Sequence, residues 1–317
     1  MLEGIVIKYH REYCWVEILE PGRPALEVVA KPRGRLELVA RARNRGFTEG
    51  REPERVVAQQ IAVGDRVRLS QPEPGSYVIE EIIERETWLL RKSLKTYRFK
   101  PQCVVANADQ LAVVVAANPL RLSVVDRYFL SAIQGGLMPL LVVNKIDLDP
   151  SLPDSVEIRS YVTRGYRVYF TAAKHGQGLE PLLTALRDKF TVFCGHSGVG
   201  KSTILCKLTG AEIAIGEVHA PTGKGRQTTS TTHFYRLPMG GAVIDTPGVR
   251  EFGLAHLTWL DVHDYFNDIA ELTQRCAFRN CTHTVEPDCA VQAAIAAGSL
   301  SAKRLESYVK LRAECSP

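Results

Sequence analysis

The chain has 317 residues, of which 45% are hydrophobic and 24% charged, and its formal net charge is +5. This composition favours a soluble globular protein and excludes a fibrous or extensively disordered one. Because single domains usually hold about 100–200 residues, the length predicts two or three domains. The apolar runs 111–117 and 137–143 are far shorter than the roughly 18 residues of a membrane helix. No signal or transit peptide is visible, so we expect a cytoplasmic protein.

Residues 1–100 alternate apolar and polar positions over short stretches that Gly and Pro separate. This period-two pattern predicts strands. The expected strands are 4–9, 13–19, 26–30, 36–42, 65–69 and 77–83. About five short strands favour a small closed β-barrel, and the OB-fold is the common nucleic-acid-binding version. The pattern also allows an SH3-like barrel or a sandwich.

Two basic clusters lie in this N-terminal region. One contains six bases with only Glu37 among them, and the other, 91–100, contains five bases and no acid. The bases of the first cluster are Lys31, Arg33, Arg35, Arg41, Arg43 and Arg45. One such cluster is expected of a solvated surface, whereas two within one domain make nucleic-acid binding an equal alternative to a solvated surface. We therefore predict an OB-fold-like, nucleic-acid-binding barrel over residues 1–100.

After residue 101, apolar strand-like runs alternate with helical stretches. The runs are 111–117, 140–143, 167–170, 191–194 and 242–244, and the helical stretches include 123–134 and 180–189. This alternation predicts a parallel sheet that helices cover on both faces. Beyond about residue 254 the pattern is helical again and ends in the stretch 290–314. The whole chain is therefore expected to be a multidomain α/β protein.

Residues 195–202 match the phosphate-binding pattern G-x-x-x-x-G-K-[ST] at every fixed position. Glycines let backbone N–H groups point at phosphate oxygens, Lys201 reaches the β- and γ-phosphates, and the Ser202 hydroxyl ligates Mg²⁺. The strand-like run 191–194 precedes this loop, as the motif requires. The expected nucleotide-binding residues are Gly195, His196, Ser197, Gly198, Val199, Gly200, Lys201, Ser202 and Thr203.

A second motif, Asp-Thr-Pro-Gly at 245–248, follows the strand-like run 242–244. Asp245 at a strand end can hold Mg²⁺ through water, and the Gly248 N–H can sense the γ-phosphate. Asp, Pro and Gly also form ordinary turns. The motif therefore carries weight because it lies downstream of a phosphate loop.

Residues 144–147, Asn-Lys-Ile-Asp, directly follow the apolar run 140–143 and resemble the N-K-x-D guanine signature of GTPases. In that signature the Asp carboxylate accepts from guanine N1–H and the exocyclic amine, so Asp147 disfavours an ATPase. Residues 171–174, Thr-Ala-Ala-Lys, resemble the S-A-K loop that packs on the base. The residues expected to bind the base are Asn144, Lys145, Ile146, Asp147, Thr171, Ala172 and Ala173.

The order of these motifs is unusual. Ordinary GTPases carry both guanine motifs after the phosphate loop, whereas here they precede it. Joining the original termini and cutting the chain elsewhere preserves the same sheet. We therefore predict a circularly permuted P-loop GTPase domain over residues 101–254. The segment beyond Gly248 then leads directly into the C-terminal domain, and we hypothesise that nucleotide state moves that domain.

Three cysteines and a histidine crowd together near the C-terminus. In a chain without secretion signals, this crowding favours a metal over disulfides. Three thiolates and one imidazole complete a tetrahedral structural zinc site, and the alternative is free buried cysteines. We predict a helical zinc-binding domain over residues 255–317 with one Zn²⁺ per chain. Its predicted ligands are Cys276, Cys281, His283 and Cys289.

The permuted motifs, the barrel and the Cys/His spacing together resemble the family of bacterial ribosome small subunit-dependent GTPases A. Residues 109–110, 122–128 and 245–253 also resemble that family. The resemblance implies Mg²⁺-dependent hydrolysis of GTP to GDP, binding to the 30S subunit and its 16S rRNA, and a role in late subunit maturation. We expect a monomer without membrane association. Two alternatives stay open: an rRNA-binding assembly factor in which nucleotide is only a switch, and a permuted GTPase of another branch.

The catalytic group is the least determined part of the site. Val249 stands where Ras-like enzymes carry the Gln that orients water, so this group must come from elsewhere. The family pattern G-x-H-T-T-T reads Gly-Arg-Gln-Thr-Thr-Ser at 225–230, with Gln227 in place of His. Its carboxamide can orient water, although a solvent-facing Gln is an equal alternative. Thr228 or Thr229 is expected to complete the Mg²⁺ shell, with Thr229 preferred. The predicted catalytic residues are Lys201, Gln227, Thr229, Asp245 and Gly248.

Overall fold

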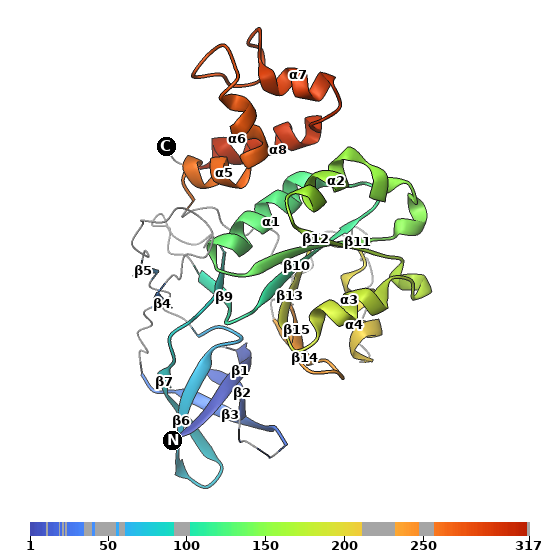
Figure 1. Ribbon diagram of the computed structural model, residues 1–317. Coiled ribbons are helices and arrows are strands. Elements are labelled where there is room, and N and C mark those ends of the chain that lie inside the picture. The colour runs from blue at the N-terminus through green and yellow to red at the C-terminus, as the bar shows by residue number, and fades with distance from the viewer. Residues whose placement is uncertain are drawn as a thin grey trace, which may run out of the picture.

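The computed structural model describes residues 1–10, 12–18, 20, 22, 24–34, 40–41, 55–56, 61–91, 102–210, 232–246 and 257–315. Three regions follow one another along the chain: a barrel, an α/β sheet region and a helical region at the C-terminal end (Figure 1). Most of the predicted strand 36–42 and of the basic stretch 91–100 lies outside the described residues. Among the described residues, no helix is long and apolar enough to cross a membrane.

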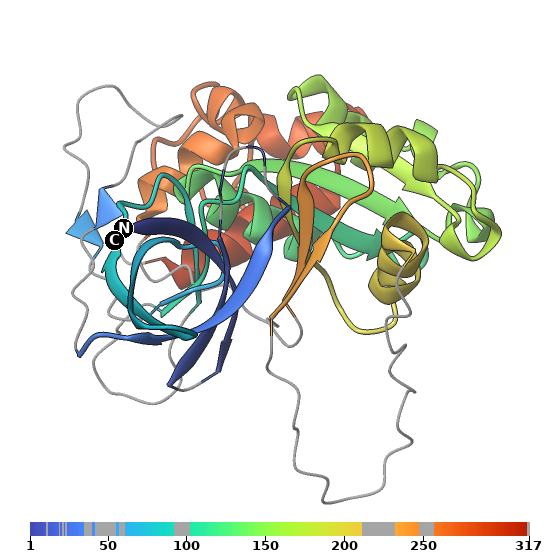
Figure 2. The same cartoon turned by 90° about the horizontal axis from the view of Figure 1, so that it is seen from below.

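The N-terminal barrel is closed by five strands in the order β1-β2-β3-β7-β6, and Figure 2 shows it end-on. Its strands are β1 Leu2–His10, β2 Tyr13–Ile18, β3 Leu26–Pro32, β6 Arg66–Glu73 and β7 Ser76–Ile82. Alternate side chains such as Cys14, Val16 and Ile18 fill its interior. The predicted closed barrel is confirmed, and a sandwich is excluded because β1 pairs with both β2 and β6. The short strands β4 Ala40–Arg41 and β5 Arg55–Val56 form a separate ladder.

A short connector joins the barrel to the sheet region. Strands β8 Trp88–Arg91 and β9 Gln102–Ala106 pair antiparallel within it. At the barrel end, Asp65 accepts hydrogen bonds from Arg85 Nε at 2.7 Å and Nη2 at 2.8 Å, and both side chains are fully buried. Since a buried charge must be paired, this ion pair fixes the end of the barrel against the connector.

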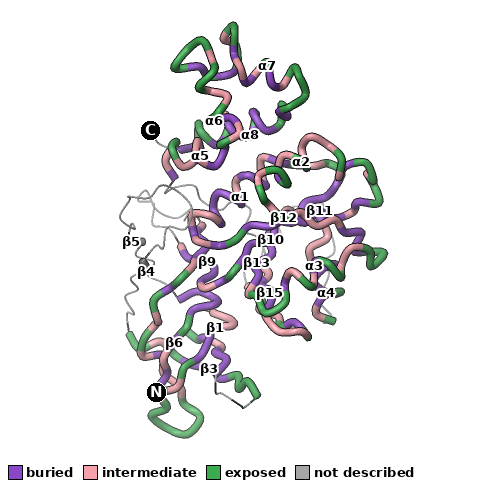
Figure 3. Tube along the Cα trace, in the orientation of Figure 1, coloured by how far each residue is buried: buried purple, intermediate pink, exposed green. Residues whose placement is uncertain are grey.

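The central sheet has the strand order β12-β11-β10-β13-β15-β14. Its strands are β10 Gln110–Ala116, β11 Met138–Asn144, β12 Arg167–Thr171, β13 Phe190–Cys194, β14 His233–Arg236 and β15 Ala242–Asp245. The first five in spatial order are parallel, which confirms the prediction, whereas the edge strand β14 is antiparallel and was not predicted. Every residue of β10 is buried, because layers cover both faces of the sheet (Figure 3).

Four helices form the two covering layers. Helices α1 Leu122–Gln134 and α2 Val156–Thr163 contribute to the core on one face, and α3 Leu179–Leu186 and α4 Lys201–Thr209 to the core on the other. The predicted helix 180–189 ends at Leu186 instead, and Asp188 beyond it adopts a left-handed φ of 55°. Short 3₁₀ turns lie at Ile146–Leu148, Leu152–Asp154 and Ala173–His175.

The C-terminal region is helical and lies against the α1 face of the sheet region (Figure 1). It contains α5 Trp259–Tyr265, α6 Asn267–Thr273, α7 Ala290–Ala296 and α8 Ala302–Glu314. The predicted helical stretch 290–314 is two helices, because Gly298 with φ 72° ends the first one. Helix α8 packs on α1, so the last helix of the chain also covers the sheet region.

Candidate functional site

The phosphate-loop motif lies where β13 ends and α4 begins, at the centre of the sheet. Gly195 has φ 148°, and a Cβ there would lie 2.2 Å from the carbonyl oxygen of Val114. Lys201 begins the helix, and its Nζ donates to the Gly195 carbonyl at 2.8 Å. The glycine therefore allows the loop to pass directly over β10, and the lysine ammonium lies within the loop.

Asn144 connects the three motifs that the sequence singled out. Its Nδ2 donates to the Val199 carbonyl at 2.8 Å, inside the phosphate loop. Its Oδ1 accepts from Thr171 Oγ1 at 3.0 Å and from the Ala173 amide at 3.1 Å. Asn144 is only 3% exposed. One buried carboxamide thus fixes the guanine loops to the phosphate loop, a bracing role that was not predicted from the motifs.

Lys145 makes a second connection between the same loops. Its backbone is left-handed with φ 61°, and its Nζ donates to the Gly198 carbonyl at 2.7 Å. Next to it, Asp147 lies in a 3₁₀ turn, with its Oδ2 3.9 Å from Nε2 of His175, a residue that the sequence did not single out. The Asp147 side chain is 40% exposed. Its carboxylate can therefore accept hydrogen bonds from a ligand at the ends of β11 and β12.

Asp245 ends β15 beside the phosphate loop, where its Cα partners are Phe193 of β13 and His233 of β14. Within the described part of the chain, its Oδ1 is buried and has no hydrogen-bond partner. Burial raises the pKa of Asp245, and Lys201 and His233 act in the opposite direction. A buried carboxylate oxygen without a partner can accept a hydrogen bond from a water molecule that is bound to Mg²⁺. Ser202 would then bind the same ion directly through its hydroxyl group.

Three predicted catalytic residues cannot be placed against this geometry. Gln227, Thr229 and Gly248 lie outside the described residues. The segments that follow the carboxyl ends of β13, β11 and β12 contain the other predicted residues: His196, Ser197 and Val199 in the phosphate loop, Ile146, and Ala172. Thr203 lies in the first turn of α4. The functional role of each predicted residue remains a prediction.

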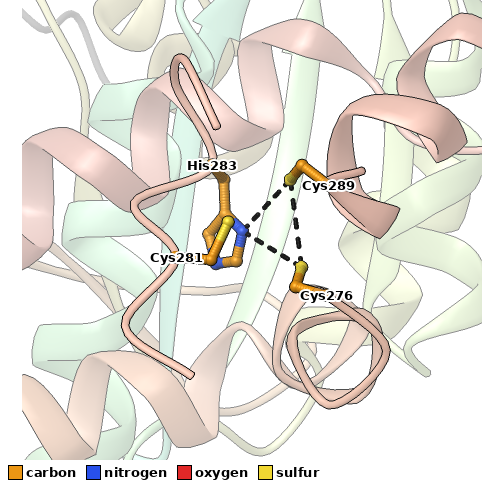
Figure 4. Close-up of side chains that lie close together, drawn as sticks. All are labelled: Cys276, Cys281, His283 and Cys289. Atoms are coloured by element: carbon orange, nitrogen blue, oxygen red, sulfur yellow. Dashed lines mark hydrogen bonds between the residues drawn. The ribbon is translucent and has the colours of Figure 1, made fainter. Parts of the chain in front are cut away.

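The four Cys and His side chains converge between α6 and α7 (Figure 4). Their ligand atoms all lie within 4.8 Å of one another. His283 Nδ1 is 3.7 Å from Cys276 Sγ and 3.5 Å from Cys289 Sγ, and the two sulfurs are 3.9 Å apart. Cys281 is the fourth member and is buried. These separations suit four ligands around one tetrahedral ion.

The contacts of the His283 ring select the nitrogen that faces the cysteines. Thr273 Oγ1 donates to the Ile269 carbonyl at 2.9 Å, so it accepts from His283 Nε2 at 3.1 Å. This leaves the Nδ1 lone pair directed at the sulfurs, an arrangement typical of metal-bound histidine. Burial raises the pKa of Cys281 to about 12, a cost that ligation to a cation offsets because it favours the thiolate. The donor set therefore fits zinc.

The phosphate loop at the centre of a parallel sheet, with guanine motifs on earlier strands, defines a GTPase of permuted motif order. The family model described as RsgA GTPase matches residues 82–255. The small ribosomal subunit biogenesis GTPase RsgA of Chlorobaculum tepidum is 40% identical over 261 residues, covering 79% of this chain and 84% of that protein. Its namesake from Saccharophagus degradans is 39% identical over 268 residues, covering 81% and 77%.

Solved structures agree with these relatives. YjeQ from Thermotoga maritima has a TM-score of 0.66 and 29% identity, with 99% of this chain and 98% of that one covered. YloQ, described as a circularly permuted GTPase, has a TM-score of 0.62 and 26% identity, with 99% and 95% covered. The chain therefore belongs to the RsgA GTPase family. The predicted fold, the permuted GTPase class and the family resemblance are confirmed, and membership implies use of a guanine nucleotide with Mg²⁺.

Proposed function

We propose that this chain binds the 30S ribosomal subunit and hydrolyses GTP there during late maturation of the subunit. Relatives covering most of the chain are named small ribosomal subunit biogenesis GTPases. The observation that carries the proposal is the Asn144 side chain, which ties both guanine loops to the phosphate loop. These hydrogen bonds join the guanine motifs, which come first in the sequence, to the phosphate loop, which follows them. The motifs can therefore bind one nucleotide together.

The proposed roles of the residues follow from their positions. Asp147 recognises guanine, and Lys201 turns from the Gly195 carbonyl to the β- and γ-phosphates of GTP. Ser202 and Asp245 would hold Mg²⁺, which neutralises phosphate charge when bound. Thr229, Gly248 and Gln227 are proposed as the third Mg²⁺ ligand, the γ-phosphate sensor and the residue that orients water. Hydrolysis thus rests on positioning and charge neutralisation, so we expect it to be slow without the subunit.

The barrel is proposed to contact 16S rRNA through the outer face of β1, β2 and β3. Lys8 Nζ lies 4.6 Å from the ring centroid of Trp15, and Lys31 Nζ lies 5.2 Å from that of Tyr13. Tyr13 is 41% exposed. Aromatic rings flanked by ammonium groups suit RNA, because bases stack on the rings while the charges attract phosphates. We call Lys8, Tyr13, Trp15 and Lys31 the aromatic–basic face.

The domain assignment that accompanies this function has three parts. We propose an RNA-binding barrel over 1–100, a GTPase domain over 101–254 and a zinc-binding domain over 255–317. One Zn²⁺ per chain would be held by Cys276, Cys281, His283 and Cys289, whose ligand atoms already converge. In this proposal the protein is a cytoplasmic monomer.

GTP hydrolysis by the purified chain, with and without purified 30S subunits, tests the proposal. We expect slow turnover of GTP, none of ATP, and a rate that rises at least about tenfold with 30S subunits. Lys201→Ala should abolish both rates, because the phosphates lose their ammonium partner. GTP binding without stimulated hydrolysis would contradict this function and favour an assembly factor for which nucleotide is only a switch.

A further inference from the structure

One side-chain contact joins the barrel to the edge of the central sheet. Arg236 of β14 and Glu17 of β2 form a two-pronged ion pair although 219 residues separate them in sequence. Arg236 Nε lies 3.3 Å from Glu17 Oε2, and Nη2 is paired with Oε1. The Glu17 side chain is 10% exposed and that of Arg236 43%. The contact is therefore geometrically specific and partly shielded from water.

On the sheet side, the pair lies in line with the strands that carry the nucleotide motifs. Arg236 and Phe190 are both register partners of Ala242, the first residue of β15. The Arg236 guanidinium also lies 5.5 Å from the centroid of the Phe190 ring and 5.1 Å from that of Phe234. Strand β13 runs from Phe190 to the phosphate loop. Strand β15 runs from Ala242 to Asp245, which lies about 10 Å further along the strand.

On the barrel side, the same strand carries the aromatic–basic face. Cys14, Val16 and Ile18 of β2 line the interior, so the alternate residues Tyr13 and Trp15 share the outer face with Glu17. Glu17 is two residues beyond Trp15. A ligand that stacks on Trp15 therefore acts on the strand that contacts the sheet.

We propose that Glu17 and Arg236 form the coupling pair through which RNA on the barrel and nucleotide on the sheet affect each other. This inference rests on the proposed function, because it assumes that the subunit stimulates hydrolysis. Both are positioning residues, since neither lies in the nucleotide site. Coupling between two binding equilibria is reciprocal, so if subunit binding changes the affinity for nucleotide through this pair, nucleotide changes the affinity for the subunit by the same factor.

Charge reversal tests the pair with the full-length protein. Glu17→Arg and Arg236→Glu each place like charges together, and the double variant restores an ion pair of opposite polarity. We measure GTP turnover with and without 30S subunits, and 30S affinity with GDP and with a non-hydrolysable GTP analogue. Each single variant should lose about tenfold in 30S-stimulated kcat with unchanged basal turnover, and the double variant should regain most of it. Affinity in the single variants should depend less on the nucleotide.

The matched control reverses Arg68, whose partners Glu81, at 2.7 Å, and Glu3, at 3.5 Å, both belong to the barrel. Arg68→Glu should leave stimulation unchanged. If a reversed charge prevents folding, as judged by circular dichroism, Glu17→Gln replaces it and must lower stimulation in the same way. Single variants with full stimulation, or a double variant that regains none, would overturn the coupling alone. A wild-type protein that 30S subunits do not stimulate would overturn the proposed function and the coupling with it.

Discussion

The sheet region contacts its two neighbours in opposite ways. Against the C-terminal helices it presents Asp126 of α1, which is fully buried. Asp126 Oδ1 accepts from Tyr161 Oη at 2.9 Å, Tyr265 Oη at 2.7 Å and Arg304 Nη1 at 2.7 Å. Against the barrel, by contrast, its ion pair uses Arg236, whose side chain is 43% exposed.

The buried arginine is also held by more partners than the exposed one. Arg304 Nε donates to Asp268 at 3.1 Å, and its guanidinium lies 3.8 Å from the centroid of the Phe266 ring. Only 1% of its side chain is exposed. These contacts unite the C-terminal helices and the α1 face into one packed unit. Movement of the C-terminal domain with nucleotide state would have to break them. The contrast with Arg236 therefore favours the barrel as the responsive part, although the buried Asp65–Arg85 pair also holds the barrel to the connector.

Removing a predicted zinc ligand is the strongest way to disturb the C-terminal side of this comparison. Intact structural zinc sites bind the ion with about 10–16 kcal/mol, and a site that lacks one ligand loses a large part of that free energy. We expect Cys289→Ser to reduce bound zinc from one per chain to none and to unfold the segment between α6 and α7. Zinc analysis and circular dichroism measure both. Cys315→Ser, at another buried cysteine outside the cluster, is the control. Full zinc in Cys289→Ser would contradict the four-ligand assignment.

Arg304→Met tests the buried interface itself. The substitution leaves Asp126 and Asp268 without their cation in a buried setting, and breaking such a pair costs about 3–5 kcal/mol. Urea unfolding followed by circular dichroism measures the loss. The control is Lys303→Met on the same helix, because that side chain is 55% exposed and its one ion-pair partner among the described residues is Glu157, at 3.5 Å. Equal losses in the two variants would mean that burial of Arg304 does not stabilise the interface.

The sequence predicted the elements whose signal is local. The continuous apolar run of β10 reflects burial on both faces, and the alternation in β2 reflects burial on one face. Both strands formed as expected. The phosphate loop and the guanine motifs were recognisable because each needs particular residues at fixed spacing. The Cys and His spacing predicted convergence for the same reason, since few arrangements bring those four side chains together.

What the sequence did not predict depends on contacts between distant segments. The edge strand β14 has only four residues and is identified by its pairing with β15. The bracing role of Asn144 required knowing that Val199 lies beside it. The partners of Asp126 are likewise 35 to 178 residues away in sequence. Motif spacing carries no information about such neighbours, which only the folded arrangement supplies.

Arg236→Met is expected to change the free energy of unfolding least. It completes the comparison, because it makes the same substitution at the barrel interface as Arg304→Met makes at the C-terminal interface. A partly exposed ion pair contributes about 0–1 kcal/mol, and methionine retains much of the packing against Phe190 and Phe234. Urea unfolding should therefore differ from wild type by less than about 1 kcal/mol. A loss as large as that of Arg304→Met would show that both neighbours are held equally firmly, and the barrel would no longer be the weakly attached part. A small loss together with reduced stimulation by 30S subunits would separate coupling from stability at this interface.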